Sequence, residues 1–260
     1  LVKESEAHGC ALPPAAADAA HDDLASASAD ELWLAFRSLV NVRPPWPAPA
    51  EFLAAQNELL QGLIAEAGIA TLADTTASPA DPRLRLWRGD ITTLAVDAIV
   101  NAANSGMTGC WAPLHYCIDN AIHTFAGVQL REACANLMAA QGHPEPTAQA
   151  KVTDAYNLPA RYVIHTVGPI ADGRPTDTHR RQLTECYQAC LDAVAGAGLA
   201  SIAFCCISTG VFGFPQAEAS SIAVATVRRW LDEHPDTPMT VVFDAFSETD
   251  ERLYRPLLGL

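Results

Sequence analysis

The stretch Ile202-Ala203-Phe204-Cys205-Cys206-Ile207-Ser208-Thr209-Gly210-Val211-Phe212-Gly213-Phe214-Pro215 decides the fold class of this chain. Its first six residues are all apolar, which is typical of a central strand that is buried on both faces. A turn with two glycines follows, and a helix is predicted from about Gln216. A strand, a glycine loop and a helix in this order present backbone N–H groups to a phosphate without Lys or Arg. A tight turn without a ligand is the other interpretation of this loop.

The same pattern recurs on both sides of this stretch. Short strands are predicted at 84–87, 98–100, 152–155, 162–167 and 240–243. Between them, apolar residues recur at helical spacing, as in the segment 183–194. Strands that alternate with helices predict an α/β layered domain, in which ligands gather at the carboxyl ends of the strands.

We assign residues 81–260 to this domain, and two segments of different character precede it. Residues 1–29 are rich in Ala, Asp and Ser, and we expect a mobile leader there. Residues 30–80 predict a helical N-terminal extension. Asp30 is a candidate N-cap for its first helix, and a second helix over about 50–67 ends at Gly68.

Charge and composition exclude several classes of function. The 260 residues carry a formal net charge of −14, which argues against a broad nucleic-acid-binding surface, although loop amides can still hold one small anion. No apolar run approaches the roughly 20 residues that cross a bilayer. The eight cysteines show no regular framework and no secretory signal is apparent, so we expect mainly reduced packing thiols and a cytoplasmic protein. Nothing in the sequence requires more than a monomer.

The segment Cys110–Asn120 combines two thiols, an imidazole and a carboxylate within a few residues. Cys110, His115 and Cys117 are preferred ligands of tetrahedral zinc, and three protein ligands leave the fourth position open, as in catalytic zinc sites. Two packing thiols and a capped histidine are the alternative. Asp119 follows within two residues of the last ligand.

Asp90 comes directly after the strand predicted at 84–87. It is a candidate cap of the next segment, and it could equally accept a hydrogen bond from a ligand amine. The sequence alone leaves both interpretations open.

Taken in order, these loops resemble those of a macrodomain, the ADP-ribose-binding module. The resemblance rests on the segments Gly89–Thr92, Val96–Asn104, Tyr156–Pro159, Val163–Pro169 and Ser208–Pro215. The segment Cys110–Asn120, followed by Ala121–Gly127, is similar to the zinc-containing branch, whose members also carry a proline-rich helical extension. The resemblance covers about residues 31–258. It implies a three-layer α/β/α sandwich with a central mixed sheet, plus the extension.

The resemblance also implies a role for each loop. Asp90 would bind the adenine amine beside the Ile91 amide, Phe246 would stack on adenine, and Asn104 and Asp119 would be the catalytic residues at the distal ribose. Ile118 and Asn120 lie next to Asp119 on the substrate side. The loop that would wrap the diphosphate and flank the ribose consists of Ser208, Thr209, Gly210, Val211, Phe212, Gly213 and Phe214. Cys110, His115 and Cys117 would ligate one Zn²⁺ per chain.

The activity implied by this resemblance is removal of ADP-ribose from mono-ADP-ribosylated proteins with the help of zinc. Zinc would polarise an oxygen or activate water, and Asp119 would act as general base or orient the ribose. A non-catalytic ADP-ribose reader is the alternative, and an α/β protein with structural or no zinc and another phosphorylated ligand is a third. The branch further suggests a sirtuin-like transferase and a lipoyl-carrier protein as partners.

Two residues depart from the pattern of the branch. Ala148 stands where the family usually has Gly, which costs about 1 kcal/mol if the position requires a positive φ. Thr108 stands where the branch tends to have Leu.

Overall fold

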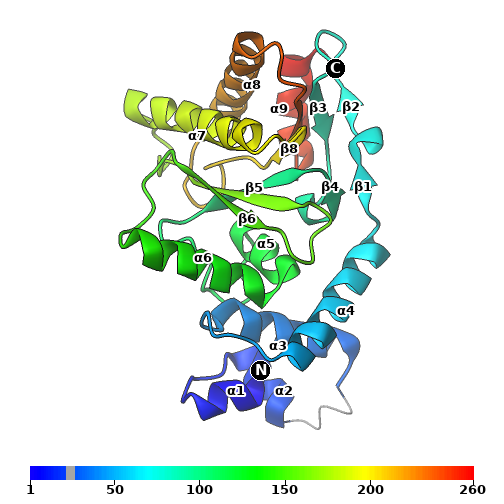
Figure 1. Ribbon diagram of the computed structural model, residues 1–260, viewed down its shortest axis with the longest axis vertical. Coiled ribbons are helices and arrows are strands. Elements are labelled where there is room, and N and C mark those ends of the chain that lie inside the picture. Colours follow the sequence, from blue (N-terminus) through cyan, green and yellow to red (C-terminus); the bar gives the residue numbers. More distant parts are fainter. Residues whose placement is uncertain (22–26) are drawn as a thin grey trace.

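A seven-stranded mixed sheet forms the centre of the molecule in the computed structural model, which describes residues 1–21 and 27–260 (Figure 1). The strand order is β2-β3-β9-β8-β5-β7-β6, and the two outer pairs, β2–β3 and β6–β7, are antiparallel whereas the rest are parallel. The strands are β2 (Thr76–Ala77), β3 (Leu84–Trp87), β5 (Ala98–Ala103), β6 (Ala150–Asp154), β7 (Tyr162–Val167), β8 (Ser201–Phe204) and β9 (Thr240–Asp244).

Strand β8 is the fourth of the seven strands and is buried along its whole length, as its apolar sequence predicts. It ends at Phe204, however, and not at Ile207. Cys205 and Ile207 are buried outside the ladder. The predicted strand was therefore too long, because an apolar run reports burial and does not distinguish a strand from the buried start of a loop.

Helices cover both faces of the sheet, so the predicted three-layer α/β/α sandwich is confirmed. Helices α7, α8 and α9 pack side by side, with α7 and α9 against strands of one face, and α5 and α6 pack against the other face (Figure 1). Their bounds are α5 (Ile118–Ala126), α6 (Val128–Gln141), α7 (Asp177–Gly196), α8 (Gln216–Glu233) and α9 (Glu248–Leu258).

The N-terminal extension lies beyond the α5–α6 layer, at the opposite end of the molecule from α7–α9 (Figure 1). Helices α3 (Ala29–Val42) and α4 (Ala50–Ala67) both contact α5, and Gly68 ends α4 as predicted. The cap of α3 is Ser28, whose hydroxyl and Glu31 form a reciprocal capping box, so the prediction of Asp30 was wrong by two residues. At residues 70–77 two short strands follow: β1 (Ala70–Thr71) pairs with β4 (Leu94–Ala95), and β2 joins the main sheet.

The segment predicted as a mobile leader contains helices α1 (Val2–Ala7) and α2 (Pro14–His21) in the part that the structure describes. Helix α2 packs against α3, and Glu4 forms an ion pair of 2.7 Å with Arg43. The stretch 22–26 of this predicted leader lies outside the described residues.

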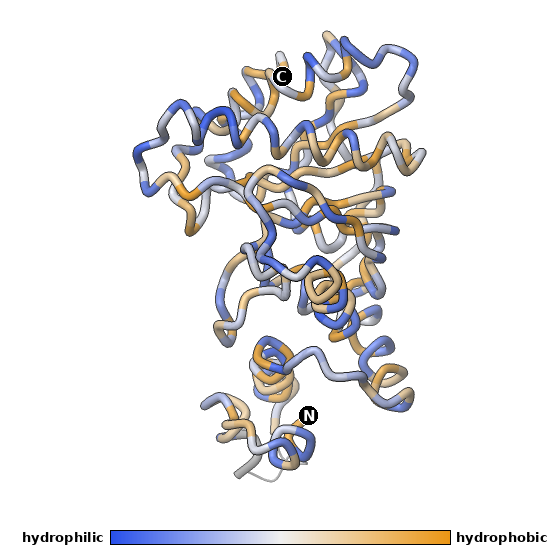
Figure 2. The backbone as a smooth tube through the Cα atoms, turned by 60° about the vertical axis from the view of Figure 1, so that its left-hand side comes forward, coloured by the Kyte–Doolittle hydropathy of each residue, from blue (hydrophilic) through white to orange (hydrophobic). Residues whose placement is uncertain are grey.

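The core lies between the sheet and its two helix layers, where the strands in the middle of the molecule are mostly hydrophobic (Figure 2). Four cysteines, Cys134, Cys186, Cys190 and Cys205, are buried and free. This agrees with the expectation of packing thiols for Cys186, Cys190 and Cys205. None of the described helices has the length and apolar character that a membrane span requires.

Candidate active site

Four loops leave the same edge of the sheet, because β3, β9, β8 and β5 are parallel neighbours. In that order they carry Asp90, Phe246, the loop 208–214 and Asn104. The predicted site residues therefore line one edge of the sheet in a row: a carboxylate, an aromatic ring, backbone amides and an amide side chain. Ligands of open α/β sheets bind at this edge.

Asp90 caps the short 3₁₀ helix η2 (Ile91–Thr93), so the capping interpretation is confirmed. Its Oδ1 accepts hydrogen bonds from the amide and the hydroxyl of Thr92, at 2.9 and 2.7 Å. Asp90 also lines a cavity of about 170 Å³ between η2 and the extension, to which Trp33 and Phe125 contribute. Capping thus uses one carboxylate oxygen, and the ligand role of Asp90 stays a prediction. Ile91 is buried.

Phe246 is 55% exposed at the end of β9, which leaves a ring face available for stacking. Its ring lies 5.8 Å from that of Tyr116, which is 78% exposed and belongs to the segment Cys110–Cys117. The two predicted ends of the site therefore contact each other through an aromatic pair.

The loop 208–214 presents free amides. Within the described part of the chain, the N–H groups of Gly210, Val211 and Phe212 have no backbone acceptor, and Val211 is 73% exposed. Such consecutive free amides form the kind of concavity that binds a phosphate. Ser208 and Phe214 are buried, and their part in binding a ligand stays a prediction.

Asn104 and Asp119 are joined directly at the last loop of the row. Nδ2 of Asn104 donates to Oδ2 of Asp119 at 3.1 Å and to the carbonyl of Gly109 at 3.0 Å. Nδ2 of Asn101 donates to the other carboxylate oxygen at 2.8 Å. Two amides thus fix the orientation of the Asp119 carboxylate. Asn101 belongs to the quoted motif, but the sequence assigned it no role.

Burial sets the protonation of the groups around Asp119. It raises the pKa of Asp119 to about 6, against the hydrogen bond from Asn101 and the charge of Arg131. Burial also lowers the pKa of His165 to about 3 and that of His123 well below its usual value, so both imidazoles are neutral. Nε2 of His123 lies 3.6 Å from Asp119, just beyond hydrogen-bonding distance.

The three predicted metal ligands come together. Nδ1 of His115 lies 3.3 Å from Sγ of Cys110, and the ligand atoms of Cys110, His115 and Cys117 are all within 4.8 Å of one another. Zinc bonds of about 2.3 Å to sulfur and about 2.0 Å to nitrogen place such atoms roughly 3.6 Å apart in a tetrahedron, so these residues fit the ion. Burial raises the pKa of the Cys117 thiol to about 12, and a thiol must lose its proton to bind a metal ion.

A second group of potential ligands, His123, Cys134 and His165, is buried behind Asp119. Both ring nitrogens of His165 already face partners, Asn101 at 3.1 Å and Thr153 at 2.9 Å. The charge of the nearby Arg131 also opposes a cation there. This group is a buried polar cluster of the core, in which the ring nitrogens of His123 have no hydrogen-bond partner among the described residues.

The extension contributes residues that the sequence did not single out. Arg37 and Asn41 lie one helical turn apart on α3, and both form hydrogen bonds with the segment Cys110–Cys117 and with helix α5. Arg37 donates to both, whereas Asn41 accepts from the segment and donates to α5. Asn120, expected to present the sugar, is fully buried and bonds the carbonyl of Ala112 instead. A polar pair at helical spacing on the buried side of an amphipathic helix was the available signal.

Comparison with known proteins agrees with this geometry. A family model described as "Macro domain" matches residues 100–223. A protein-ADP-ribose hydrolase of Treponema medium is 55% identical over 232 residues, which cover 88% of each chain. The chain belongs to the macrodomain family.

Solved macrodomain structures share the fold. The Trypanosoma brucei macrodomain in complex with ADP-ribose is 32% identical with a TM-score of 0.67, and the match covers 86% of this macrodomain and 95% of that chain. The Oceanobacillus iheyensis macrodomain with MES bound is 38% identical with a TM-score of 0.62, over 68% of this chain and 90% of the other.

Proposed function

We propose that this macrodomain is a zinc-dependent hydrolase that removes ADP-ribose from mono-ADP-ribosylated proteins. The observation that carries the proposal is the position of the group Cys110, His115 and Cys117, which adjoins Asn104 and Asp119 at one end of the row of sheet-edge loops. The name of the Treponema medium relative supports the hydrolase activity. The sirtuin-like transferase and the lipoyl-carrier protein stay predictions.

The order of the loops matches the order of the parts of ADP-ribose. Phe246 and Asp90 would bind adenine, the free amides of the loop 208–214 would bind the diphosphate, and Asn104 with Asp119 would receive the distal ribose. A diphosphate bound by amides alone is consistent with a chain of net charge −14. The scissile bond would then lie at the metal end of the row.

The residues of the chain would orient the reacting groups. The Asp119 carboxylate, held by Asn101 and Asn104, accepts a hydrogen bond from a ribose hydroxyl, which fixes the sugar relative to the metal ligands. Cys110, His115 and Cys117 would hold the zinc, which would supply a Lewis acid to an oxygen of the substrate or to water. Burial around Asp119 excludes bulk water and so strengthens these interactions.

A release assay tests the proposal. Zinc-loaded protein is incubated with a mono-ADP-ribosylated protein, with and without chelator, and free ADP-ribose is measured. We expect chelation, Cys117→Ser and Asp119→Ala each to lower the rate at least 100-fold, whereas Asp119→Ala keeps its bound zinc. Unchanged turnover after complete metal removal would eliminate the zinc role. ADP-ribose binding without release from any modified substrate would identify a reader instead.

A further inference from the structure

Residues 108–117 carry Cys110, His115 and Cys117, the three proposed zinc ligands, and are called the metal loop. Helix α3 of the extension contacts this loop. Asn41 is 2% exposed and uses both ends of its amide. Its Oδ1 accepts from the Leu114 amide at 2.9 Å, and its Nδ2 donates to the Thr124 hydroxyl of α5 at 3.0 Å. Asn41 therefore ties the residue before His115 to the helix that follows the loop.

Arg37 holds the other side of the same ligand. Its Nη2 donates to the carbonyl of His115 at 3.4 Å and to Oδ1 of Asn120 at 3.3 Å. Asn120 in turn donates to the carbonyl of Ala112 at 3.2 Å. The backbone on both sides of the His115 side chain is thus hydrogen-bonded, directly or through Asn120, to one face of α3.

The metal loop needs such support because its own conformation is unfavourable. Leu114 has a φ of 58°, in the left-handed region, which is unfavourable for a residue with a side chain. The backbone hydrogen bonds inside residues 112–117 are two, His115 to Ala112 and Cys117 to His115, both at 3.2 Å. Strained conformations persist only where neighbouring structure imposes them, and Asn41 bonds the strained residue itself.

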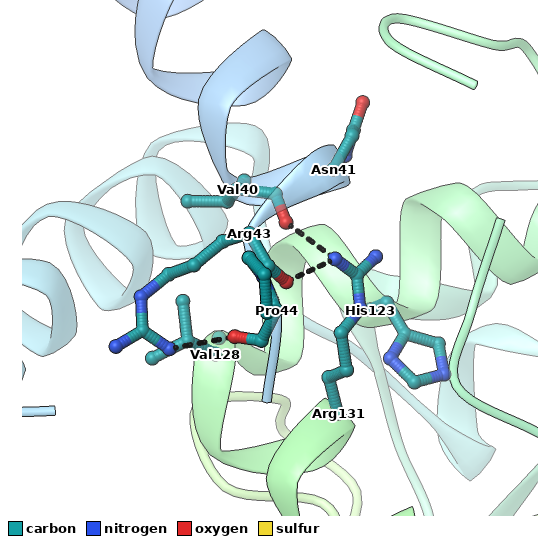
Figure 3. A pocket seen from close by; sticks show the side chains of 8 residues that line it. Val40, Asn41, Arg43, Pro44, His123, Val128 and Arg131 are labelled. Atoms are coloured by element: carbon teal, nitrogen blue, oxygen red, sulfur yellow. Dashed lines mark hydrogen bonds between the residues drawn. The ribbon is translucent and has the colours of Figure 1, made fainter. Parts of the chain in front are cut away.

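Arg131 of α6 secures the start of the metal loop to the end of α3. Its Nη1 donates to the carbonyls of Val40 and Arg43, at 3.0 and 2.7 Å (Figure 3). Its Nε donates to the carbonyl of Thr108 at 2.7 Å, and its guanidinium lies 4.3 Å from the centre of the Trp111 ring, next to Cys110. The end of α3 is thereby fixed relative to both halves of the loop.

From these contacts we infer that Arg37 and Asn41 are positioning residues for the metal, which orient His115 toward Cys110 and Cys117. The inference rests on the proposed function for the presence of zinc. It assigns the N-terminal extension a part in the site: α3 sets the affinity of the metal loop for zinc, although it contributes no ligand.

Zinc affinity is the decisive measurement, because it does not depend on turnover. The dissociation constant for Zn²⁺ is measured by competition with a fluorescent chelator on the full chain, and the release rate by chelator chase. We expect Asn41→Ala and Arg37→Ala each to weaken binding by about 10–100-fold, as for other residues that orient metal ligands. Arg37→Lys, which keeps a donor, should recover part of the affinity.

Asn57→Ala is the matched control. Asn57 lies on α4 and accepts a hydrogen bond from Asn157 at 2.9 Å, so it also ties the extension to the main domain, but away from the metal loop. The variant Asn57→Ala should have the same dissociation constant for Zn²⁺ as the original protein. Equal zinc affinity and release in Asn57→Ala, Asn41→Ala and Arg37→Ala would overturn the inference.

The result also separates this inference from the proposed function. If the original protein takes up no zinc that depends on Cys110 and Cys117, the metal part of the proposed function fails, and the inference fails with it. If the original protein binds zinc through Cys110 and Cys117, and Asn41→Ala and Arg37→Ala bind zinc as tightly as the original protein, the proposed function stands and the inference alone is wrong. Should Asn41→Ala fold poorly, Arg37→Ala still gives an answer, because the Arg37 side chain is only half-buried.

Discussion

Asp244 is a buried carboxyl at the end of β9, and its Oδ1 has no hydrogen-bond partner among the described residues. Burial, together with the charges of Asp90 and Asp250, raises its pKa well above the ordinary value of 3.8. The folded state therefore keeps a proton that the unfolded chain loses above about pH 4, and stability falls as the pH rises from there, by at most about 1.4 kcal/mol per pH unit.

Asp244→Asn should remove this dependence. We expect the variant to match the original protein in free energy of unfolding near pH 4 and to exceed it by an increasing amount as the pH rises to 8, as measured by urea denaturation. Asp236→Asn, at an exposed position, serves as the control and should leave the slope unchanged. An identical pH slope in Asp244→Asn would show that another group is responsible.

Phe246 tests the adenine end of the site. Removing a ring on which a base stacks typically costs about 1–3 kcal/mol, so Phe246→Ala should weaken ADP-ribose binding roughly 5- to 150-fold in calorimetry. Phe246→Tyr keeps the ring and should bind almost normally. Equal affinities of both variants for ADP-ribose would indicate that adenine binds elsewhere, for instance at the cavity lined by Asp90, Trp33 and Phe125.

At the scale of elements, the loop 208–214 depends on one glycine more than on the other. Gly213 has a φ of 64°, and a side chain there would lie 3.1 Å from the Gly173 nitrogen, whereas an added carbon at Gly210 meets nothing within 4 Å. Gly213→Ala should therefore lower the free energy of unfolding by at least about 1–2 kcal/mol. Gly210→Ala should be nearly neutral, and equal losses in the two variants would contradict this difference.

Element boundaries show what local patterns miss. The Pro-rich segment and Gly68 correctly located α4, because proline and glycine act on their own backbone. The cap of α3 was misplaced from Ser28 to Asp30, although the spacing of Ser28 and Glu31 matches a capping box in the sequence itself. The positive φ suspected at Ala148 is confirmed at 71°.

At the scale of the whole molecule, zinc and the extension should stabilise each other. If α3 raises zinc affinity, bound zinc must stabilise the docking of α3 by the same free energy. Free zinc at a thousandfold excess over its dissociation constant adds about 4 kcal/mol. For a chain of this size that raises Tm by roughly 10 °C.

Hydrogen exchange on zinc-loaded and zinc-free protein checks this coupling. Amides of α3 should exchange faster after zinc removal through local opening, whereas a change in the central strand β8 would report only the loss of global stability. Cys117→Ser should abolish both the Tm shift and the exchange difference. If zinc removal changed the exchange of amides in the metal loop but not in α3, the extension would not be coupled to the metal.

The sequence by itself determined the α/β layers, the glycine loop after the central strand, and the spacing of Cys110, His115 and Cys117, because these depend on periodicity and on residues close together in the chain. Only the tertiary structure decided that Asp90, Phe246, the loop 208–214 and Asn104 lie in a row, since strand order brings together loops that are far apart in sequence. It alone decided that Asn41 and Arg37 hold the metal loop. A hydrogen bond between residues more than 70 positions apart leaves no local pattern from which it could be predicted.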